Sequence, residues 1–235
     1  MKLHTLQHGE QPLDLFIAEP TGPGPHPTVM VCHAWSGRRA FEEDRARALA
    51  EQGYLAVAVD VYGVGQRGQD AASSRALMMG MVDNPDLFHE RLTLIHAAVA
   101  GLPQVDAERV AVIGYCFGGM CALLMARLGL PLRAAVSFHG LLKFRPLETR
   151  PQARMLVLHG QDDPMVPPQD VGAWAQEMQR IGGDWQLHAY PGVMHSFTNP
   201  AAADPSYALY DAQADARSWA AMQHFLGEAF TSAAP

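Results

Sequence analysis

The chain has 235 residues, a formal net charge of −7 and no block of basic residues. This charge pattern excludes proteins that hold nucleic acid or an anionic membrane with a basic patch. A composition of 49% hydrophobic and 17% charged residues is typical of a globular protein, and the length predicts a single domain over residues 1–235. The three cysteines are an odd number in a chain too long to need disulfide staples, so we expect free thiols.

We expect neither an N-terminal signal peptide nor a membrane span in this sequence. The N-terminal sequence MKLHTLQHGEQPLDLF has no apolar run of signal-peptide length. No stretch approaches the 18 or so consecutive apolar residues of a membrane span. We therefore expect a cytoplasmic protein with no membrane partner.

Short apolar runs alternate with helix-like segments along the chain. The predicted strands cover residues 13–18, 28–33, 55–63, 108–115, 132–140, 153–160 and 185–190. The predicted helices cover residues 41–54, 85–102, 118–129, 167–183 and 207–230, and residues 63–84 are predicted to be a loop followed by a helix. This alternation predicts an α/β fold, a mostly parallel sheet with helices on both faces, whose reactive groups gather beyond the carboxyl ends of the strands.

The sequence GYCFGG, residues 114–119, joins a predicted strand to a predicted helix. Small residues at Gly114 and Gly118 suit a sharp turn that projects the Cys116 side chain, as in the G-x-S-x-G nucleophile elbow. The helix N-terminus that follows favours a thiolate. The alternative is a buried, unreactive cysteine in a glycine-rich turn, the role that we expect for Cys32 and Cys121. The strand-turn-helix context favours a nucleophile at Cys116.

A nucleophile of this kind needs a histidine base and an acid that orients it, in the chain order nucleophile, acid, histidine. Asp162 and Asp163 directly follow a predicted strand, and His195 lies in the loop after a later one. The two aspartates are alternatively a polar turn that caps the next helix. His139 and His159 end predicted strands and are candidates for hydrogen-bond support of the site.

An oxyanion hole is also required for acyl transfer. One donor should be the backbone N–H of Phe117, directly after the nucleophile, and the other should come from the loop after an early strand. That loop contains Trp35, whose N–H is the predicted second donor. Trp35 is alternatively only a core residue, although a backbone donor is compatible with a packed side chain.

At these residues the chain resembles the dienelactone hydrolase family of α/β-hydrolases, from about residue 13 to residue 227. The resemblance is carried by GYCFGG around Cys116, HGQDDPMVP around Asp163, PGVMHSF around His195, and the helix-strand unit RALAEQGYLAVAVDVYG. It implies the α/β-hydrolase fold and a triad of Cys116, Asp163 and His195, which selects Asp163 over Asp162. It also implies hydrolysis of esters or lactones without a metal or organic cofactor.

Two positions depart from the family pattern. Ala34 stands where well-known members have a glutamate that holds the resting cysteine, so we expect Cys116 to pair directly with His195. Asn199 stands where they have an arginine that grips a substrate carboxylate, which an amide cannot replace. Arg67 or Arg75 would have to supply such a contact; the alternative is that both are solvated.

The sequence therefore predicts a cysteine-dependent hydrolase acting on a small ester or lactone through an acyl-enzyme on Cys116. One alternative is a non-catalytic protein of the same fold that binds a small ligand. Another is a redox sensor that uses Cys116 and Cys121, although a disulfide at that spacing would be strained. The histidines show no metal-binding spacing such as H-E-x-x-H, and no feature of the sequence sets the oligomeric state.

Overall fold

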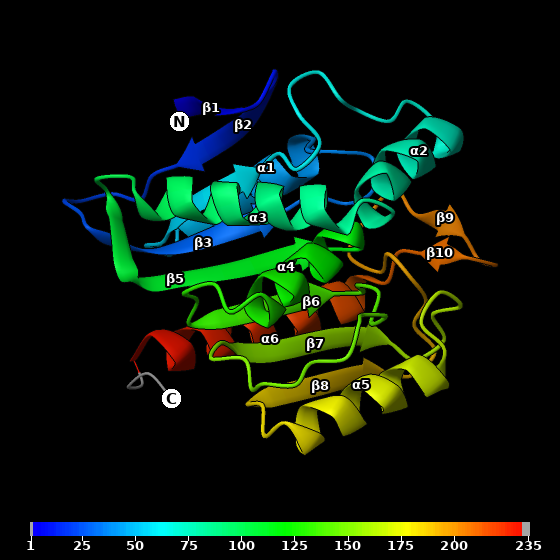
Figure 1. Ribbon diagram of the computed structural model, residues 1–235. Helices are drawn as coiled ribbons and strands as arrows, with labels where there is room; N and C mark the ends of the chain where they lie inside the picture. Colours follow the sequence, from blue (N-terminus) through cyan, green and yellow to red (C-terminus); the bar gives the residue numbers. More distant parts are fainter. Residues whose placement is uncertain (1, 232–235) are drawn as a thin grey trace. The chain divides into compact units, whose positions relative to one another are not determined.

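The computed structural model describes residues 2–231, in which strands and helices alternate along most of the chain (Figure 1). The chain divides into two compact units, Met1–Ile113 and Gly114–Pro235, and each is described by itself below. That residues 1–235 act as a single domain stays a prediction.

The first unit is built on a sheet with the strand order β1-β2-β4-β3. Its strands are β1 (Lys2–His8), β2 (Gln11–Ala18), β3 (His26–Cys32) and β4 (Leu55–Val59). β1 and β2 form an antiparallel pair, β2 pairs antiparallel with β4, and β3 and β4 are parallel. The sequence of β4, LAVAV, is apolar throughout because every one of its residues is buried.

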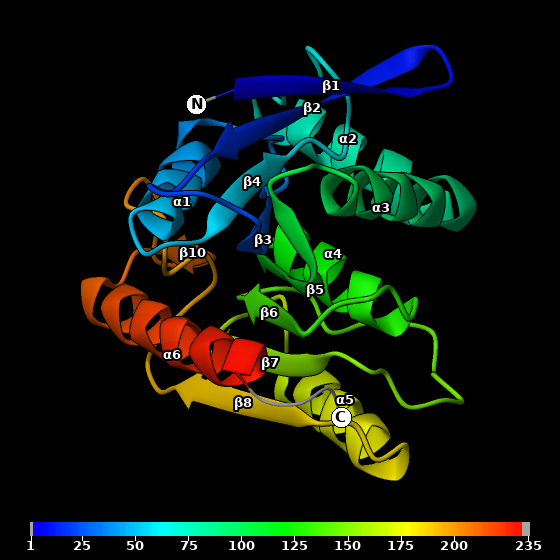
Figure 2. The same ribbon diagram turned by 90° about the vertical axis from the view of Figure 1, so that its left-hand side faces the viewer.

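Helices cover both faces of this first sheet. They are α1 (Ala40–Ala50), α2 (Ala71–Val82) and α3 (Pro85–Ala100). Figure 2 shows α1 on one side of β3 and β4 and α3 on the other. Local signals set the helix starts: the Asp70 carboxylate accepts the Ser73 N–H at 2.7 Å before α2, and Pro85 opens α3, where its missing N–H costs no hydrogen bond.

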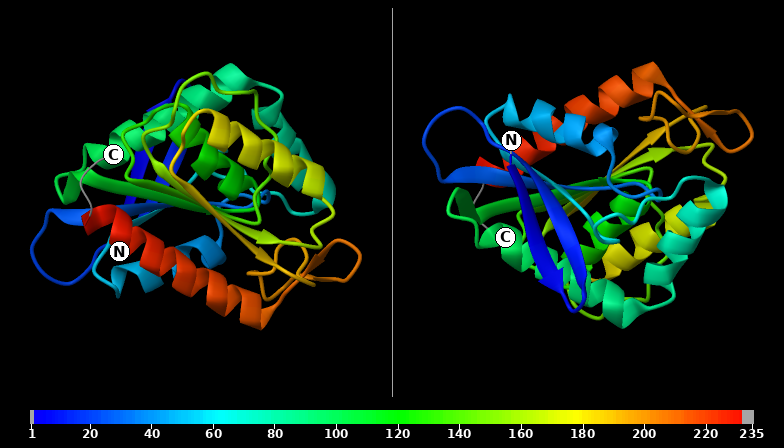
Figure 3. Two further views of the ribbon diagram at one scale, coloured as in Figure 1. Left: turned by 90° about the horizontal axis from the view of Figure 1, so that it is seen from below. Right: turned by 90° about the horizontal axis from the view of Figure 1, so that it is seen from above.

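The second unit contains parallel strands in the order β6-β7-β8. These are β6 (Ala134–Phe138), β7 (Arg154–Gly160) and β8 (Trp185–Tyr190), and the last residues of β5 (Val105–Tyr115) also belong to this unit. Its helices are α4 (Phe117–Arg127), α5 (Pro168–Arg180) and α6 (Ala212–Thr231). Figure 3 shows α4 and α5 on one face of these strands and α6 on the other. The predicted arrangement of parallel strands with helices on both faces is confirmed.

The sequence-based assignment was wrong at two places. It missed β1, a mostly exposed strand that forms an antiparallel pair with β2. It also began the last helix at residue 207, whereas α6 begins at Ala212. Residues 208–209 instead form β10 (Ala208–Leu209), which pairs with β9 (Ala203–Asp204), and the Asp211 carboxylate accepts the Ala214 N–H at 2.8 Å. This cap, rather than the apolar spacing further back, sets the start of the helix.

Among residues 2–231, we find no helix with the length and apolar character that a membrane crossing requires.

Candidate active site

Cys116 occupies a strained turn between β5 and α4. Its backbone has φ 55° and ψ −115°, a conformation that residues other than glycine rarely adopt. The turn is tight enough that a Cβ atom on Gly114 would overlap the backbone of Gly118. The Cys116 N–H donates to the Phe138 carbonyl at 3.0 Å. The two glycines therefore permit the close approach, and β6 holds the turn in place.

The substitution Gly114→Ala is expected to destabilise the fold, because its methyl group overlaps backbone atoms that cannot rotate away. We expect a loss of at least about 3 kcal/mol of unfolding free energy, at the upper end of the usual cost of overpacking. Urea unfolding of the variant measures this loss.

Gly80→Ala is the matched control. Gly80 lies in α2 with open space around its Cβ position, so the same substitution should stabilise the protein by about 0.5–1 kcal/mol. Equal unfolding midpoints for the two variants would contradict the steric argument at Gly114.

The structure brings together three side chains from three separate loops of the second unit. His195 Nε2 lies 3.2 Å from Cys116 Sγ, and His195 Nδ1 lies 2.7 Å from Asp163 Oδ2. The side chains follow β5, β7 and β8 respectively in the order Cys116, Asp163, His195. All three residues are buried, with 8% of Cys116, 3% of Asp163 and 2% of His195 exposed. The geometry permits proton transfer between the sulfur and the imidazole.

The environment of His195 favours its charged form. Burial alone lowers the pKa of His195, but the Cys116 sulfur and the Asp163 carboxylate outweigh burial and raise this pKa to about 10. Because Asp163 Oδ2 accepts from Nδ1, Nε2 is the ring nitrogen that faces the sulfur. A protonated His195 is therefore favoured at neutral pH.

Two further histidines, His139 and His159, lie near His195. The His139 ring lies edge-on to the His195 ring at 5.1 Å, and His139 Nε2 lies 2.9 Å from Thr198 Oγ1. Burial lowers the pKa of His159, and the His195 cation opposes the pull of Asp163 on it. His139 thus contacts the histidine loop through Thr198, and His159 stays neutral beside the charged site.

The two predicted oxyanion donors lie in different units. Phe117 is the first residue of α4. Trp35 lies in the loop after β3, where its carbonyl oxygen accepts the Tyr62 hydroxyl at 3.0 Å. The donor role of both N–H groups stays a prediction.

Residues 13–230 match the sequence profile of the dienelactone hydrolase family. The chain belongs to this family of hydrolases. Its members' α/β-hydrolase fold is also seen in a crystal structure of a dienelactone hydrolase-like promiscuous phosphotriesterase from metagenomic libraries, with a TM-score of 0.92 and 35% identity. That similarity covers 97% of this chain and 98% of the other.

Two curated relatives extend the comparison. An uncharacterised Caenorhabditis elegans protein is 38% identical over 146 residues, which is 60% of this chain and 92% of that protein. A Yersinia pestis protein that carries the name carboxymethylenebutenolidase as a provisional assignment is 29% identical, over 86% of this chain and 79% of that protein. Membership of the family makes this chain a hydrolase of the ester and lactone type.

The sequence analysis missed one residue beside the site. The ring of Tyr207 lies 6.2 Å from the ring of His195, and 39% of Tyr207 is exposed. The pairing that brings it there is the Leu209 N–H donating to the His195 carbonyl at 3.1 Å. The sequence D-P-S-Y, which ends at Tyr207, could have indicated a turn here rather than a helix. In the structure, Ser206 donates hydrogen bonds to the Asp204 carboxylate.

The residues considered for gripping a substrate carboxylate have local roles in the structure. Asn199 accepts the Ala201 N–H at 3.0 Å through its side-chain oxygen. Arg67 forms an ion pair at 3.2 Å with the fully buried Asp60, so it is not a solvated arginine. Arg75 is exposed on α2.

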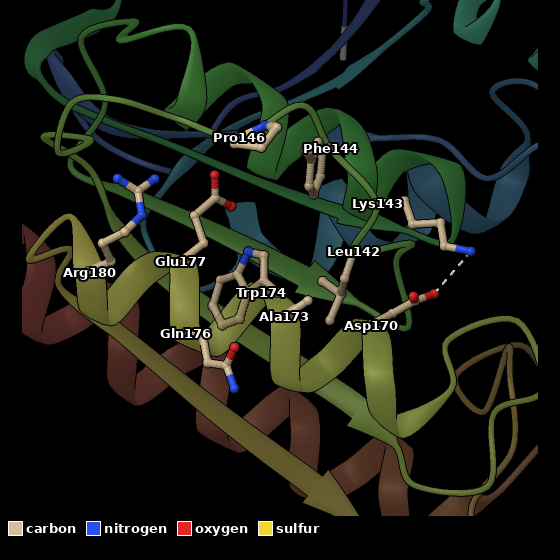
Figure 4. Close-up of a pocket in the computed structure, with 10 residues that line it drawn as sticks. All are labelled: Leu142, Lys143, Phe144, Pro146, Asp170, Ala173, Trp174, Gln176, Glu177 and Arg180. Atoms are coloured by element: carbon tan, nitrogen blue, oxygen red, sulfur yellow. Dashed lines mark ion pairs between the residues drawn. The ribbon is translucent and has the colours of Figure 1, made fainter.

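A cavity of about 440 Å³ in the second unit lies between α5 and the segment that follows β6. Figure 4 shows the apolar side chains of Leu142 and Trp174 in it, with Lys143 paired to Asp170 at 3.4 Å. The triad candidates are not among its lining residues, so we assign it no part in the reaction.

Within residues 2–231, no group of three or more histidine, cysteine, aspartate or glutamate side chains is arranged to hold a metal ion.

Proposed function

We propose that the protein is a cysteine-dependent hydrolase of small esters or lactones, with Cys116 as nucleophile, His195 as general base and acid, and Asp163 as the orienting acid. The observation that supports this assignment most strongly is the continuous contact from Cys116 Sγ through His195 to Asp163. A protein that only binds a ligand has no need of these three groups in hydrogen-bond order.

In the proposed reaction, the Cys116 thiolate attacks the carbonyl carbon and forms a thioester while the alkoxide leaves. His195 protonates this alkoxide, then takes a proton from water, which attacks the thioester and releases the acid. Asp163 keeps the imidazole in one orientation and stabilises its cation. The N–H group of Phe117 holds the oxyanion and contributes on the order of 3 kcal/mol. No metal or organic cofactor takes part in these steps.

This chain has Ala34 at the position where well-known family members have an activating glutamate. Direct pairing of Cys116 with His195 takes over the role of that glutamate. The 3.2 Å separation of the sulfur and Nε2 supports this route. A different glutamate acts nearby in sequence: Glu42, from α1, accepts the Ala34 N–H at 3.1 Å. Its role is to hold the backbone of the loop rather than to contact a substrate.

The relatives suggest two substrate classes for the same site. The name carboxymethylenebutenolidase points to a lactone, and the metagenomic structure is described as a phosphotriesterase. A thiolate attacks a phosphorus atom as it attacks a carbonyl carbon. The ester oxygen then leaves as an alkoxide, which His195 protonates. Because Asn199 replaces the family's arginine, we favour substrates without a free carboxylate.

Iodoacetamide should label Cys116 faster than Cys32 or Cys121 at neutral pH, because the thiolate is the reactive form and both other cysteines are fully buried. The decisive comparison is with His195→Gln, which should slow labelling of Cys116 by removing its cationic partner. Mass mapping of the labelled peptides over time measures both rates. Unchanged labelling of Cys116 in His195→Gln would count against the proposed ion pair.

A further inference from the structure

The hairpin of β9 and β10 is tied to the loop that carries His195 by backbone hydrogen bonds. The Leu209 N–H donates to the His195 carbonyl at 3.1 Å, and the Asp211 N–H donates to the Phe197 carbonyl at 3.1 Å. Figure 1 shows β9 and β10 at the side of the second unit toward which the arrows of β6, β7 and β8 point. The hairpin is thus a fixed neighbour of His195 at the carboxyl ends of these strands.

Two apolar side chains of this hairpin are exposed beside His195. They are Tyr207, which is 39% exposed, and Leu209, which is 40% exposed. Side chains two positions apart in an extended segment lie on the same face of it, and the Tyr207 ring lies 6.2 Å from the His195 ring. Single exposed apolar residues are common, but a pair on one face beside a reactive group indicates contact with a ligand.

The rings that lie next to His195 differ in their access to solvent. The His139 ring lies edge-on at 5.1 Å and is buried, with 3% of the residue exposed. Tyr207, by contrast, is exposed on the hairpin. A substrate arrives from solvent, so it approaches His195 past Tyr207 rather than past His139.

The chemistry of the proposed reaction determines which part of the substrate lies near His195. The Cys116 sulfur forms a bond to the acyl carbon, and the bond from that carbon to the ester oxygen breaks. This oxygen takes the proton from His195 Nε2, which lies 3.2 Å from the sulfur. The acyl group stays on Cys116, whereas the leaving group departs along His195. A side chain that contacts the His195 ring therefore meets the leaving group.

The composition of the hairpin indicates the chemical class of that leaving group. Residues 200–211 contain two aspartates, Asp204 and Asp211, and no lysine or arginine. The hairpin thus offers no cation to pair with an anionic leaving group. An aromatic side chain instead favours another ring, which packs against it offset or edge-on. A neutral aryl group fits this surface best.

We propose that Tyr207 and Leu209 form the binding surface for the leaving group and select esters of uncharged aryl alcohols. This inference rests on the proposed function, because attack by Cys116 on an ester defines the leaving group. The contact with the ring is made in the bound substrate as well as in the transition state. Its loss therefore raises KM and leaves kcat nearly unchanged.

A matched set of three esters tests where the Tyr207 ring makes its contact. Phenyl acetate has its aromatic ring on the leaving group, ethyl benzoate has it on the acyl group, and ethyl acetate has none. We expect Tyr207→Ala to lower kcat/KM for phenyl acetate about 10-fold, mainly through KM, as the loss of an aromatic contact does. The other two esters should stay within about 2-fold of wild type. Comparing variant with wild type on each ester cancels the different intrinsic reactivities of the esters.

Three further variants complete the test. Tyr207→Phe keeps the ring and should stay within about 2-fold of wild type for every ester. Leu209→Ala should lower kcat/KM for phenyl acetate alone, by about 3-fold, and keeps the proposal testable if Tyr207→Ala fails to fold. Leu3→Ala is the matched control for Leu209→Ala, since Leu3 is an exposed leucine on β1, and it should leave all three rates unchanged.

Three results would overturn the proposal while Cys116→Ala is inactive. Equal losses for all three esters in Tyr207→Ala would assign the hairpin to support of the His195 loop. A larger loss for ethyl benzoate than for phenyl acetate would place the ring at the acyl group. Wild-type kcat/KM for phenyl acetate in folded Tyr207→Ala and Leu209→Ala would exclude the contact. If Cys116→Ala, whose hairpin is intact, hydrolyses phenyl acetate at the wild-type rate, the proposed function itself fails.

Discussion

Cys116→Ala is expected to lower kcat/KM for p-nitrophenyl acetate by at least about 10³-fold, because removing the nucleophile of a triad abolishes covalent catalysis. The variant keeps His195 and Asp163 but has no atom that attacks the carbonyl. A methyl group fits the space of the thiol, so the fold should persist. Initial rates at neutral pH, with unfolding midpoints as a check on structure, measure the effect.

Cys121→Ala is the matched control, since Cys121 is fully buried in α4 and we expect it to serve the packing of the core. It should keep the wild-type rate, whereas a redox sensor that uses both cysteines would lose its response to peroxide. A phosphotriester assayed with the same proteins should also require Cys116. Equal background hydrolysis by wild type and Cys116→Ala would remove the case for a hydrolase acting through this sulfur.

Asp163→Asn is expected to lower kcat by about 10²–10⁴-fold, as when an amide replaces the acid of a Ser-His-Asp triad. An amide nitrogen donates where the carboxylate accepted, so it would favour the wrong tautomer of His195. Asp162→Asn is the control, because Asp162 is exposed and adjacent. Similar losses in both variants would contradict the choice of Asp163.

The same substitution should shift the pH dependence. His195 has a pKa of about 10 in the folded protein against an ordinary value of 6.5. Its stabilising contribution is therefore full below about pH 6.5 and is lost as the pH rises through 10. Without the Asp163 carboxylate this pKa falls, so the alkaline limb of the rate profile and the loss of stability both move to lower pH.

The sequence predicted the strands of the second unit and the loops that hold the triad candidates, because their signals are local. A strand that runs into Gly114, Cys116 and Gly118 has few alternatives to a sharp turn, and β8 matches its predicted range, residues 185–190. Parallel strands that are connected by helices also have all their carboxyl ends at the same edge of the sheet. This rule explains why residues as distant in sequence as Cys116 and His195 were predicted to meet.

Features that depend on contacts between residues distant in sequence could not be predicted from local sequence patterns. β1 is mostly exposed and lacks an apolar pattern, since it is stabilised by its antiparallel pairing with β2. Tyr207 reaches His195 only because residue 208 pairs with the histidine loop rather than continuing a helix. The hydrogen bond from the Val61 N–H to His33 likewise joins residues 28 positions apart, which no local pattern reveals.

The unusual backbone of Cys116 has a consequence for the evolution of this chain. A positive φ at a residue with a side chain costs on the order of 1–3 kcal/mol, and glycine at this position would relieve that cost. The protein would thus be more robust without its thiol. A cysteine where glycine would make the fold more stable is what we expect if stability is traded for activity at this position.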